Sequence, residues 1–500
     1  MTVAELIAAL NGQVEIIEQR GKLDQAIAAV TDDSRAVKPG TLFLAVKGER
    51  VDGHDFVRQA IQAGATAVVA QAEVDAGGAT LVRVGDSRKA VGLIGSRFNG
   101  DPAAGLTMIG VTGTNGKTTT TYLCKALLEQ LDRRVGLIGT VAYQIGQETI
   151  PASHTTPGAL ELQALLFKMK HARLDSVVME VSSHALAMDR TAGCEYDAAV
   201  FTNLTQDHLD YHKTMDEYFQ AKLKLFTGLG KGKKSGQRAI LNMDDPRGDQ
   251  IKAACLVPVW GYAVQQRADL RAEHVRLSMA GTTFTAATPA GTFVVESRLV
   301  GEHNVYNLLG AMGVALHAGA TCDQVREAVA QVANVPGRFE RVVAGQNFTV
   351  VVDYAHTEDA LLRLLSAAQA LRTNRIITVF GCGGDRDRGK RPKMGRAAVE
   401  YSDVVVLTSD NPRTEDPMAI LKEVEVGVLE ALKRRSRVEY HLVADRRDAI
   451  GTAVGLAKPG DIVLIAGKGH EDYQIIGTKK FHFDDREVAR EAIQQLRNCA

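Results

Sequence analysis

One short stretch constrains the chain more than any other, the glycine-rich segment Gly113-Thr-Asn-Gly-Lys-Thr-Thr119. An apolar run at 108–111 precedes it, and apolar residues at helical spacing follow it at 122–128. A strand, a glycine-rich turn and a helix that opens on Lys-Thr are the context of a phosphate-binding loop. In such a loop Lys117 would offset phosphate charge, and the Thr118 hydroxyl would be placed to hold Mg²⁺. The first glycine of the strict Walker pattern falls on Val111, so we predict a variant loop; a glycine-rich turn capped by threonine is the alternative.

The bulk composition is that of an ordinary globular chain, with 45% apolar and 24% charged residues and a formal net charge of zero. The absence of a long basic block argues against a nucleic-acid partner. Six scattered cysteines form no CxxC pair, which favours reduced thiols. No basic and apolar leader opens the sequence, and no apolar run approaches the roughly 18 residues of a membrane span. We therefore expect a cytoplasmic protein, without a membrane span and monomeric.

The length of 500 residues favours about three domains, and breaker clusters at 99–102 and 336–340 place their boundaries. We predict a small α/β domain at 1–102, a central doubly wound and mostly parallel sheet at 103–337, and a Rossmann-like α/β domain at 338–500. The expected strands are 41–46, 67–70, 107–112, 135–140, 176–181, 198–203, 239–242, 350–353, 376–380, 404–408 and 462–466, with a β-rich patch at 282–300. The expected helices include 54–63, 88–98 and 304–318.

Polar side chains stand where several predicted central strands end, which is the edge where open α/β sheets bind ligands. Glu180 ends one apolar strand and would either hold Mg²⁺ near the phosphates or pair with a neighbouring base. The next strand leads into a loop that is dense in Asp and His and includes His208. The spacing of these residues favours a capped loop and a metal site equally. Lys222 follows the capping sequence Thr214-Met-Asp-Glu217 on a predicted helix, where spacing alone favours a surface lysine.

Three charged or glycine-rich loops follow strands of the predicted C-terminal sheet. The first runs from Gly381 to Pro392 and contains Arg386 and four glycines, which suggest an anion-gripping loop. The second is Asp410-Asn-Pro-Arg413, whose arginine offers a planar fork suited to a carboxylate, and the third is Gly467-Lys-Gly-His-Glu471. Three such loops on one sheet edge favour a substrate pocket over three separate solvated turns.

These motifs together resemble those of the Mur ligase family. The resemblance covers the chain from about residue 30 to residue 480, and its motifs occur in order. It rests on the phosphate loop, Met179-Glu-Val-Ser-Ser-His184, the segment 201–208, Gly301-Glu-His-Asn-Val-Tyr-Asn307, Gly337-Arg-Phe-Glu340, Asp353-Tyr-Ala-His356 and the three C-terminal loops.

The resemblance implies that the first domain binds a UDP group, the second ATP and the third an incoming amino acid. Ser34 would contact the UDP-sugar, although the residue types of Thr31-Asp-Asp-Ser-Arg35 alone favour a plain turn. The residues implied for the sugar-peptide are Thr155, Thr156, Ser182 and Arg190. Those implied for ATP are Gly113, Thr114, Asn115, Gly116, Lys117, Thr118, Thr119, Asn307, Arg338 and Asp353. Those implied for the amino acid are Arg386, Asp410, Asn411, Pro412, Arg413, Gly467 and Glu471.

The resemblance further implies a catalytic group of Lys117, Glu180, His208 and Lys222, in which Thr118, Glu180, His208 and Lys222 serve Mg²⁺. Lys222 matches the family's carbamylated lysine, which overrides the surface position favoured by spacing. Reaction of the neutral amine with CO₂ turns a positive charge into a negative one and supplies the oxygens that Mg²⁺ prefers.

The implied reaction is ATP-dependent amide formation between UDP-N-acetylmuramoyl-L-alanyl-D-glutamate and meso-2,6-diaminopimelate. L-Lysine is the alternative amino acid, but it lacks the distal carboxylate that Arg413 would pair with. A folylpolyglutamate synthase would not need the Ser34 domain. A non-catalytic nucleotide-binding relative remains an alternative, which intact Lys117, Glu180 and Lys222 disfavour.

Overall fold

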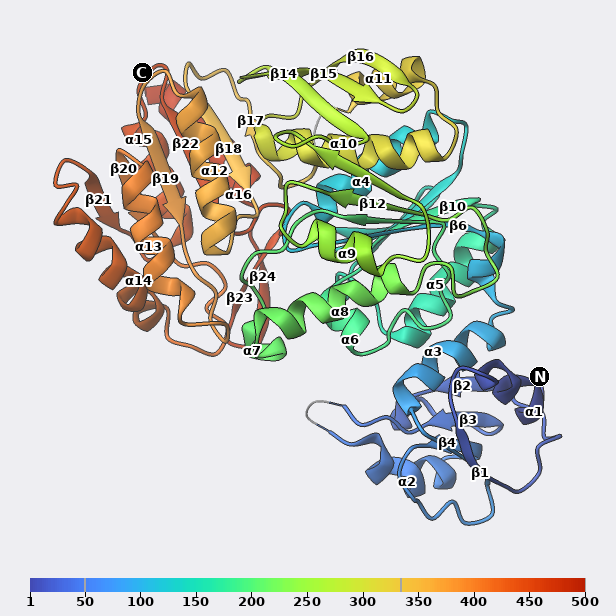
Figure 1. Ribbon diagram of the computed structural model, residues 1–500. Helices are drawn as coiled ribbons and strands as arrows, with labels where there is room; N and C mark the ends of the chain where they lie inside the picture. The colour runs from blue at the N-terminus through green and yellow to red at the C-terminus, as the bar shows by residue number, and fades with distance from the viewer. Residues whose placement is uncertain (49–50, 333–334, 500) are drawn as a thin grey trace.

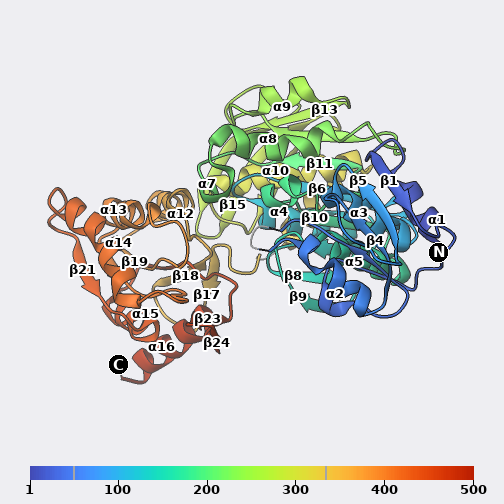
Figure 2. The ribbon, with the colours of Figure 1, turned by 90° about the horizontal axis from the view of Figure 1, so that it is seen from below.

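The computed structural model describes residues 1–48, 51–332 and 335–499, with side chains to residue 497, as three successive α/β sheets and a separate hairpin (Figure 1). The C-terminal region lies beside the central one in two perpendicular views, and the N-terminal region lies below the central one in the first of them (Figures 1 and 2). The predicted α/β class with a mostly parallel central sheet is confirmed. Among the described residues, no helix is both long and apolar enough to cross a bilayer.

The N-terminal sheet has five strands in the order β1-β5-β4-β3-β2, parallel except for β1. Apolar helix faces cover both of its sides. Its strands are β1 (Ile16–Arg20), β2 (Ala29–Thr31), β3 (Thr41–Leu44), β4 (Ala65–Ala70) and β5 (Thr80–Val84). Its helices are α1 (Val3–Ile7), α2 (Val57–Gln62) and α3 (Ser87–Phe98), with short 3₁₀ turns η1 (Ala8–Leu10), η2 (Ser34–Ala36), η3 (Gly53–Phe56) and η4 (Pro102–Gly105).

The central sheet has a parallel middle, with β6 between β11 and β10. One face packs on α4, α10 and α11, and the other on α5, α8 and α9, so apolar strands are covered on both sides. The parallel strands are β6 (Thr107–Thr112), β7 (Val135–Ile138), β10 (Ser176–Glu180), β11 (Ala198–Phe201), β12 (Arg238–Asn242) and β13 (Val259–Ala263). The helices are α4 (Lys117–Glu129), α5 (Ala159–His171), α6 (Ser183–Ala187), α7 (Leu209–His212), α8 (Met215–Thr227), α9 (Gly248–Ala254), α10 (Glu302–His317) and α11 (Cys322–Gln331).

Antiparallel strands extend this sheet at both edges to eleven strands. A hairpin is added beside β7, and β14 pairs parallel with β13 before an antiparallel meander. The β-rich patch predicted at 282–300 is part of that meander, whereas the hairpin beside β7 has only a weak sequence signal because its outer strand is exposed. The added strands are β8 (Ala142–Ile145), β9 (Glu148–Pro151), β14 (Leu270–Ser278), β15 (Gly281–Thr288) and β16 (Gly291–Ser297).

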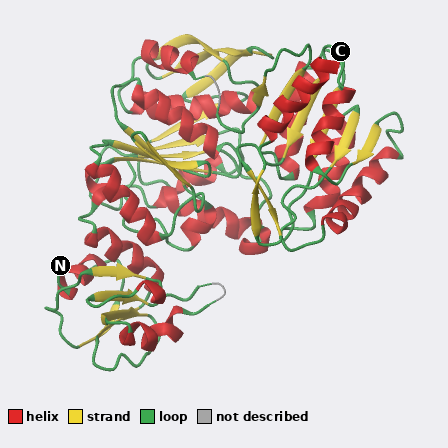
Figure 3. Ribbon diagram, turned by 180° about the vertical axis from the view of Figure 1, so that it is seen from behind, coloured by secondary structure: helices red, strands yellow, loops and turns green. Residues whose placement is uncertain are grey.

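The C-terminal sheet has six strands in the order β17-β18-β22-β19-β20-β21, all parallel except β17. A two-stranded hairpin, β23 (Tyr473–Ile476) and β24 (Lys479–His482), lies on the side of this domain that faces the central domain (Figure 3). The six strands are β17 (Glu340–Val342), β18 (Thr349–Asp353), β19 (Ile376–Phe380), β20 (Val404–Leu407), β21 (Glu439–Leu442) and β22 (Ile462–Ala466). The helices are α12 (Glu358–Leu371), α13 (Lys390–Tyr401), α14 (Pro417–Leu432), α15 (Arg446–Leu456) and α16 (Asp485–Cys499).

The described cysteines are free thiols, as expected from their scattered positions. They are Cys124, Cys194, Cys255, Cys322 and Cys382. The side chain of Cys499 lies outside the described part of the chain.

Candidate functional site

The glycine-rich segment forms the turn between β6 and α4, as the sequence predicts. Gly116 has a φ of +87°, and a Cβ at this position would overlap the side-chain oxygen of Asn307. Gly113 has a φ of +149°, and a Cβ there would overlap the hydroxyl of Thr202. Only glycine fits both positions without strain, and α4 begins directly after Gly116. The loop therefore presents a helix N-terminus to the adjoining cavity, as phosphate binding requires.

Two lysine ammonium groups meet at the carbonyl of Gly113. Lys117 Nζ donates to this oxygen at 3.0 Å and to the Thr114 carbonyl at 2.8 Å, while Lys222 Nζ donates to the Gly113 oxygen at 2.8 Å. Lys222 is 1% exposed, so the surface position favoured by spacing alone is wrong. Burial lowers the pKa of Lys222 well below its ordinary value, and the charge of Lys117 lowers it further. Lys222 therefore has a larger neutral, nucleophilic fraction than a surface lysine.

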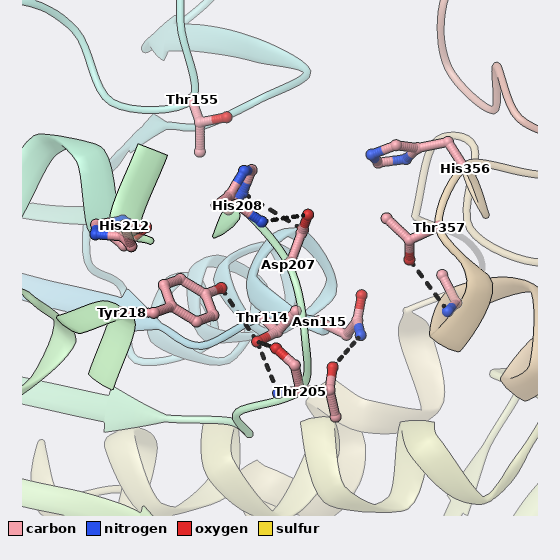
Figure 4. Close-up of polar contacts among 12 residues, drawn as sticks. Thr114, Asn115, Thr155, Thr205, Asp207, His208, His212, Tyr218, His356 and Thr357 are labelled. Carbon is pink, nitrogen blue, oxygen red and sulfur yellow. Dashed lines mark hydrogen bonds and ion pairs between the residues drawn. The ribbon is translucent and has the colours of Figure 1, made fainter. Parts of the chain in front are cut away.

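Helix α8 ties Lys222 to the phosphate loop. The predicted helix start is confirmed, because Thr214 Oγ1 accepts from the Glu217 N–H at 3.1 Å. One turn before Lys222, the Tyr218 hydroxyl pairs with Thr114 Oγ1 at 3.1 Å (Figure 4). The Tyr218 ring centroid lies 4.5 Å from Lys222 Nζ. The helix thus fixes the amine behind the loop.

Three of the four predicted metal ligands border one cavity of about 790 Å³, namely Thr118, Glu180 and His208. The buried Glu180 carboxylate accepts from the Thr140 N–H at 2.9 Å and from its hydroxyl at 3.1 Å. Burial lowers the pKa of His208 to about 4, so its imidazole is neutral at pH 7. The hydroxyl and carboxylate oxygens suit Mg²⁺. In the described parts of the chain, however, no three His, Cys, Asp or Glu side chains form a metal-binding group, so a magnesium centre would need further oxygens.

The residues implied for the rest of ATP border the same cavity: Asn307, Arg338 and Asp353. Arg338 joins the two domains, since it donates to Thr118 Oγ1 at 3.1 Å and stacks 4.6 Å from the Tyr354 ring centroid. The Asp353 carboxylate accepts two backbone N–H bonds at 2.7 and 2.9 Å, although burial raises its pKa. The residues implied for ATP therefore come from both the central and the C-terminal domain.

Sequence reasoning missed Asp359, which joins these two domains. Its Oδ2 accepts from Asn115 Nδ2 at 2.5 Å, from Thr205 Oγ1 at 3.1 Å and from Arg363 Nε at 3.0 Å. Asp359 lies in the first turn of α12, where an acidic residue is unremarkable in sequence. Asn115 is 244 residues away, so only the fold reveals the contact.

The residues implied for the sugar-peptide gather beside the end of β10. Thr156 Oγ1 donates to the Glu180 carbonyl at 2.8 Å and accepts from the Ser182 N–H at 2.9 Å. Arg190 Nη1 donates to the Thr156 carbonyl at 3.2 Å. Thr155 borders the same cavity as His208, and both side chains are drawn in Figure 4. The structure thus brings these four residues together next to the predicted metal ligand Glu180.

Ser34 stands apart from that group, in the N-terminal domain. It begins the 3₁₀ turn Ser34–Ala36, which Asp33 caps by accepting from the Arg35 N–H at 2.9 Å. It is not one of the residues that border the cavity. The local geometry is the turn that the residue types predict, and a role for Ser34 stays a prediction.

The arginines of two C-terminal loops lie close together. Arg413 Nη1 donates to the Gly384 carbonyl at 2.7 Å, and the residue has a φ of +52°. Burial lowers the pKa of Arg386, and the neighbouring charge of Arg413 lowers it further. Arg386 borders the cavity that the phosphate loop also borders. Two adjacent guanidinium groups favour an anion between them.

The glycines of the first loop serve a different purpose from the one suggested by the sequence. A Cβ on Gly381 would overlap the Thr408 carbonyl oxygen, and one on Gly384 would overlap that of Pro412. Small residues are needed here because the two loops pack backbone to backbone. The groups of this loop that suit an anion are therefore its arginines, and the anion-binding role of the loop stays a prediction.

The remaining residues implied for the amino acid form a buried polar group. Asp410 and Asn411 are both at most 5% exposed, and Asn411 Nδ2 donates to Glu471 Oε2 at 2.8 Å. A Cβ on Gly467 would lie 2.7 Å from Asp410 Oδ2, so the second and third loops touch. The structure thus unites the three loops that the sequence placed on one edge.

A phosphate loop on one sheet and a charged pocket on another, facing one cavity, define a multidomain nucleotide-binding enzyme of the P-loop type. Three family models match successive parts of the chain: the Mur ligase family, catalytic domain (residues 26–98), the Mur ligase middle domain (111–315) and the Mur ligase, glutamate ligase domain (337–469). The chain belongs to the Mur ligase family.

Curated relatives of nearly the same length are named UDP-N-acetylmuramoyl-L-alanyl-D-glutamate–2,6-diaminopimelate ligase. The relative from Geobacillus thermodenitrificans is 48% identical over 473 residues, which cover 94% of this chain and 96% of the relative. The one from Syntrophomonas wolfei is 44% identical over 495 residues and 99% of each chain. The one from Geobacter sulfurreducens is 47% identical over 489 residues, covering 95% of this chain and 96% of the relative.

Solved structures agree with this assignment. A structure of UDP-N-acetylmuramoyl-L-alanyl-D-glutamate–2,6-diaminopimelate ligase superposes with a TM-score of 0.71 at 35% identity and covers 99% of this chain and all of that one. A Thermotoga maritima MurF ligase solved with ADP has a TM-score of 0.60 at 18% identity, covering 94% of this chain and 97% of that one. The second likeness shows a shared fold alone.

Proposed function

We propose that this chain is an ATP-dependent amide ligase that joins meso-2,6-diaminopimelate to the D-glutamyl carboxylate of UDP-N-acetylmuramoyl-L-alanyl-D-glutamate. The observation that carries this proposal is that Arg386, adjacent to Arg413, borders the same cavity as the phosphate loop. An activated carboxylate and an amino acid would therefore meet in one space. The names of full-length relatives at 44–48% identity support the same substrates.

We assign UDP-group binding to residues 1–102, ATP binding to 103–337 and amino-acid binding to 338–500. Ser34 would serve the UDP-sugar, and Thr155, Thr156, Ser182 and Arg190 the sugar-peptide next to Glu180. ATP would lie against the loop 113–119 and the cavity residues Asn307, Arg338 and Asp353.

In the proposed reaction the D-glutamyl carboxylate attacks the γ-phosphorus of ATP, which gives an acyl phosphate and ADP. Lys117 and the N–H groups at the start of α4 stabilise the negative charge of the transferring phosphoryl group. The neutral amine of diaminopimelate then attacks the acyl carbon, loses a proton, and phosphate leaves as the amide forms. Positioning by the two domains supplies much of the rate.

Mg²⁺ fits the oxygen donors of Thr118 and Glu180, with His208 close by, and when bound it would offset phosphate charge. Lys222 would contribute as a carbamate. Its burial and the adjacent Lys117 favour the neutral amine that reacts with CO₂, and the resulting anion relieves the contact between two cations at Gly113. The carbamate adds the oxygens that the described carboxylates do not provide.

The amino-acid assignment depends on the two arginines. Diaminopimelate differs from lysine by a distal carboxylate, which would lie against the guanidinium groups of Arg386 and Arg413. Lysine would leave them without an anion, a loss of about 1–3 kcal/mol for a charged donor left unpaired. Discrimination of roughly tenfold or more follows. The lysine-adding form of the same ligase is thereby disfavoured.

Phosphate release in mixtures that each lack one substrate tests the function. ATP, UDP-N-acetylmuramoyl-L-alanyl-D-glutamate and meso-diaminopimelate together should give ADP, phosphate and one new amide product by mass. Omission of any one of them should abolish product formation, and Lys117→Met should be inactive. Phosphate release that does not depend on the amino acid, or no phosphate release at all, would instead support a non-catalytic or differently specific relative.

A further inference from the structure

A fully buried lysine lies inside the group of residues implied for the amino acid. Lys468 is 0% exposed, and its Nζ donates to Asn411 Oδ1 at 3.1 Å and to Glu471 Oε2 at 3.2 Å. Asp410 Oδ1 is 3.9 Å from the same nitrogen. We propose that Lys468 is a positioning residue of the amino-acid site, whose ammonium keeps Glu471 ionised and Asn411 oriented so that they receive the amine of the incoming amino acid. The inference rests on the proposed function of that site.

The contacts form a closed triangle. Asn411 Nδ2 donates to Glu471 Oε2 at 2.8 Å, and Asn411 Oδ1 accepts from Lys468 and from the Ile475 N–H at 2.9 Å. The lysine thereby fixes which way the amide faces. Both bonds to Glu471 end on Oε2, and Oε1 makes none to the described residues. Oε1 is therefore the oxygen available to a substrate ammonium.

The charges around Glu471 explain why an ammonium is needed. Burial, the largest influence, raises the pKa of Glu471, and the nearby Asp410 carboxylate raises it further. Lys468 and Asn411 act in the opposite direction. The Glu471 carboxylate also interacts electrostatically with the Arg446 guanidinium, from α15, and with the phenols of Tyr354 and Tyr473. Without Lys468, Glu471 would share a buried pocket with a second carboxylate and would take up a proton at higher pH.

A protonated Glu471 would attract the substrate ammonium less strongly, so the effect reaches the substrate through pH. If the pKa of the Glu471 carboxyl rises, this group takes up its proton at a higher pH when the solution is acidified. Binding of diaminopimelate then weakens at that higher pH. A lysine that served only the stability of the fold would weaken all substrates alike and would not move this midpoint. The pH dependence of KM for diaminopimelate therefore separates the two roles.

The test compares the unchanged protein with Lys468→Met, Glu471→Gln and the double variant, using KM for meso-diaminopimelate and for ATP across pH 5.5–9. Lys480→Met is the matched control, because Lys480 Nζ lies over the same Tyr473 ring at 4.2 Å but is exposed. We expect Lys468→Met to raise KM for diaminopimelate by about tenfold or more, since a buried charge loses its partner. KM for ATP should stay within about twofold, as for a change remote from the nucleotide.

The midpoint at which KM for diaminopimelate rises on acidification should move to higher pH in Lys468→Met, and Lys480→Met should keep the midpoint of the unchanged protein. Because the effect acts through Glu471, adding Lys468→Met to Glu471→Gln should change KM little. An unmoved midpoint, a parallel rise in KM for ATP, or a further multiplied rise in the double variant would overturn the proposal. If Lys468→Met fails to fold, the double variant, which loses both charges, gives the same comparison against Glu471→Gln. A failure of the unchanged protein to use diaminopimelate would refute the proposed function instead.

Discussion

At the scale of single residues, the site depends on buried charges whose partners lie far away in sequence. Lys222 illustrates this, because helical spacing alone favours a solvated surface position, whereas the fold places its amine against the Gly113 carbonyl. The sequence contains the lysine but not the loop that covers it, 109 residues earlier. The phosphate loop itself was predictable, since strand, glycines and helix are contiguous.

The first prediction concerns Lys222. Lys222→Met should lower phosphate release by about 100-fold or more. The variant lacks the side chain proposed to hold Mg²⁺ beside the reacting phosphate. Lys224, on the same helix, donates to the Leu186 carbonyl and pairs with Asp189 at the surface, so the activity of Lys224→Met should stay within about twofold of the unchanged protein. Steady-state phosphate release checks both, and equal activities of the two variants would contradict the role of Lys222.

The second prediction concerns pH and Glu415, which braces the arginine loops. Its carboxylate accepts two bonds from Arg391, at 3.0 and 2.8 Å, and one from the Asp385 N–H at 2.5 Å, and its pKa is lowered to about 2. A carboxyl whose pKa is lowered in the folded protein stabilises the fold at pH values above its pKa in the unfolded chain, which is about 4.3. That contribution is lost as the pH falls towards 2. Urea unfolding measured from pH 7 to pH 2 should show that Glu415→Gln has a lower free energy of unfolding than the unchanged protein, by a margin that shrinks as the pH falls. A margin independent of pH would argue against this.

At the scale of elements, close backbone packing decides where helices and loops sit. The carbonyl of Pro392, on α13, would overlap a Cβ on Gly427 of α14, so the two helices touch through a glycine. Gly451, on α15, has nothing within 4 Å of such a Cβ. We expect Gly427→Ala to destabilise the protein by about 1–3 kcal/mol through overpacking, and Gly451→Ala to stabilise it by up to about 1 kcal/mol. Urea unfolding measures both changes, and the same sign for both would contradict the packing argument.

Most strands were predictable as elements because they are buried apolar runs between turn signals, as in β6 and β22. The β8–β9 hairpin was not, since its outer strand is mostly exposed and carries little apolar pattern. From the sequence, the glycines at 381 and 384 indicate an anion loop, because a sequence cannot show that a second loop, at 408–412, packs against them. Whether a segment forms a strand depends mainly on its own residues, whereas the packing of a loop depends on residues elsewhere in the chain.

At the scale of the whole molecule, the cavity exists because the central and C-terminal domains face each other. Asp359 bonds to Asn115 and Thr205, and Arg338 bonds to Thr118. These contacts were beyond sequence reasoning, since each joins residues more than 150 positions apart. We expect the domains to separate and close in each catalytic cycle.

A reversible cross-link tests that motion. A disulfide in Thr205→Cys/Asp359→Cys would join the domains where the two side chains meet at 3.1 Å. Oxidation should lower steady-state turnover by about tenfold or more, because substrate entry and product release need opening, and reductant should restore it. The reduced double variant is its own control, and mass measurement confirms the link. Full turnover by the cross-linked enzyme would contradict the predicted motion.

The most direct test of the central claim is the ratio of kcat/KM for meso-diaminopimelate to that for L-lysine, measured by phosphate release with ATP, Mg²⁺ and UDP-N-acetylmuramoyl-L-alanyl-D-glutamate. The arginine pair predicts a ratio of roughly tenfold or more in favour of diaminopimelate, and Arg413→Met should bring the ratio towards one. A ratio near one for the unchanged protein, or a preference for lysine, would contradict the account of the amino-acid site.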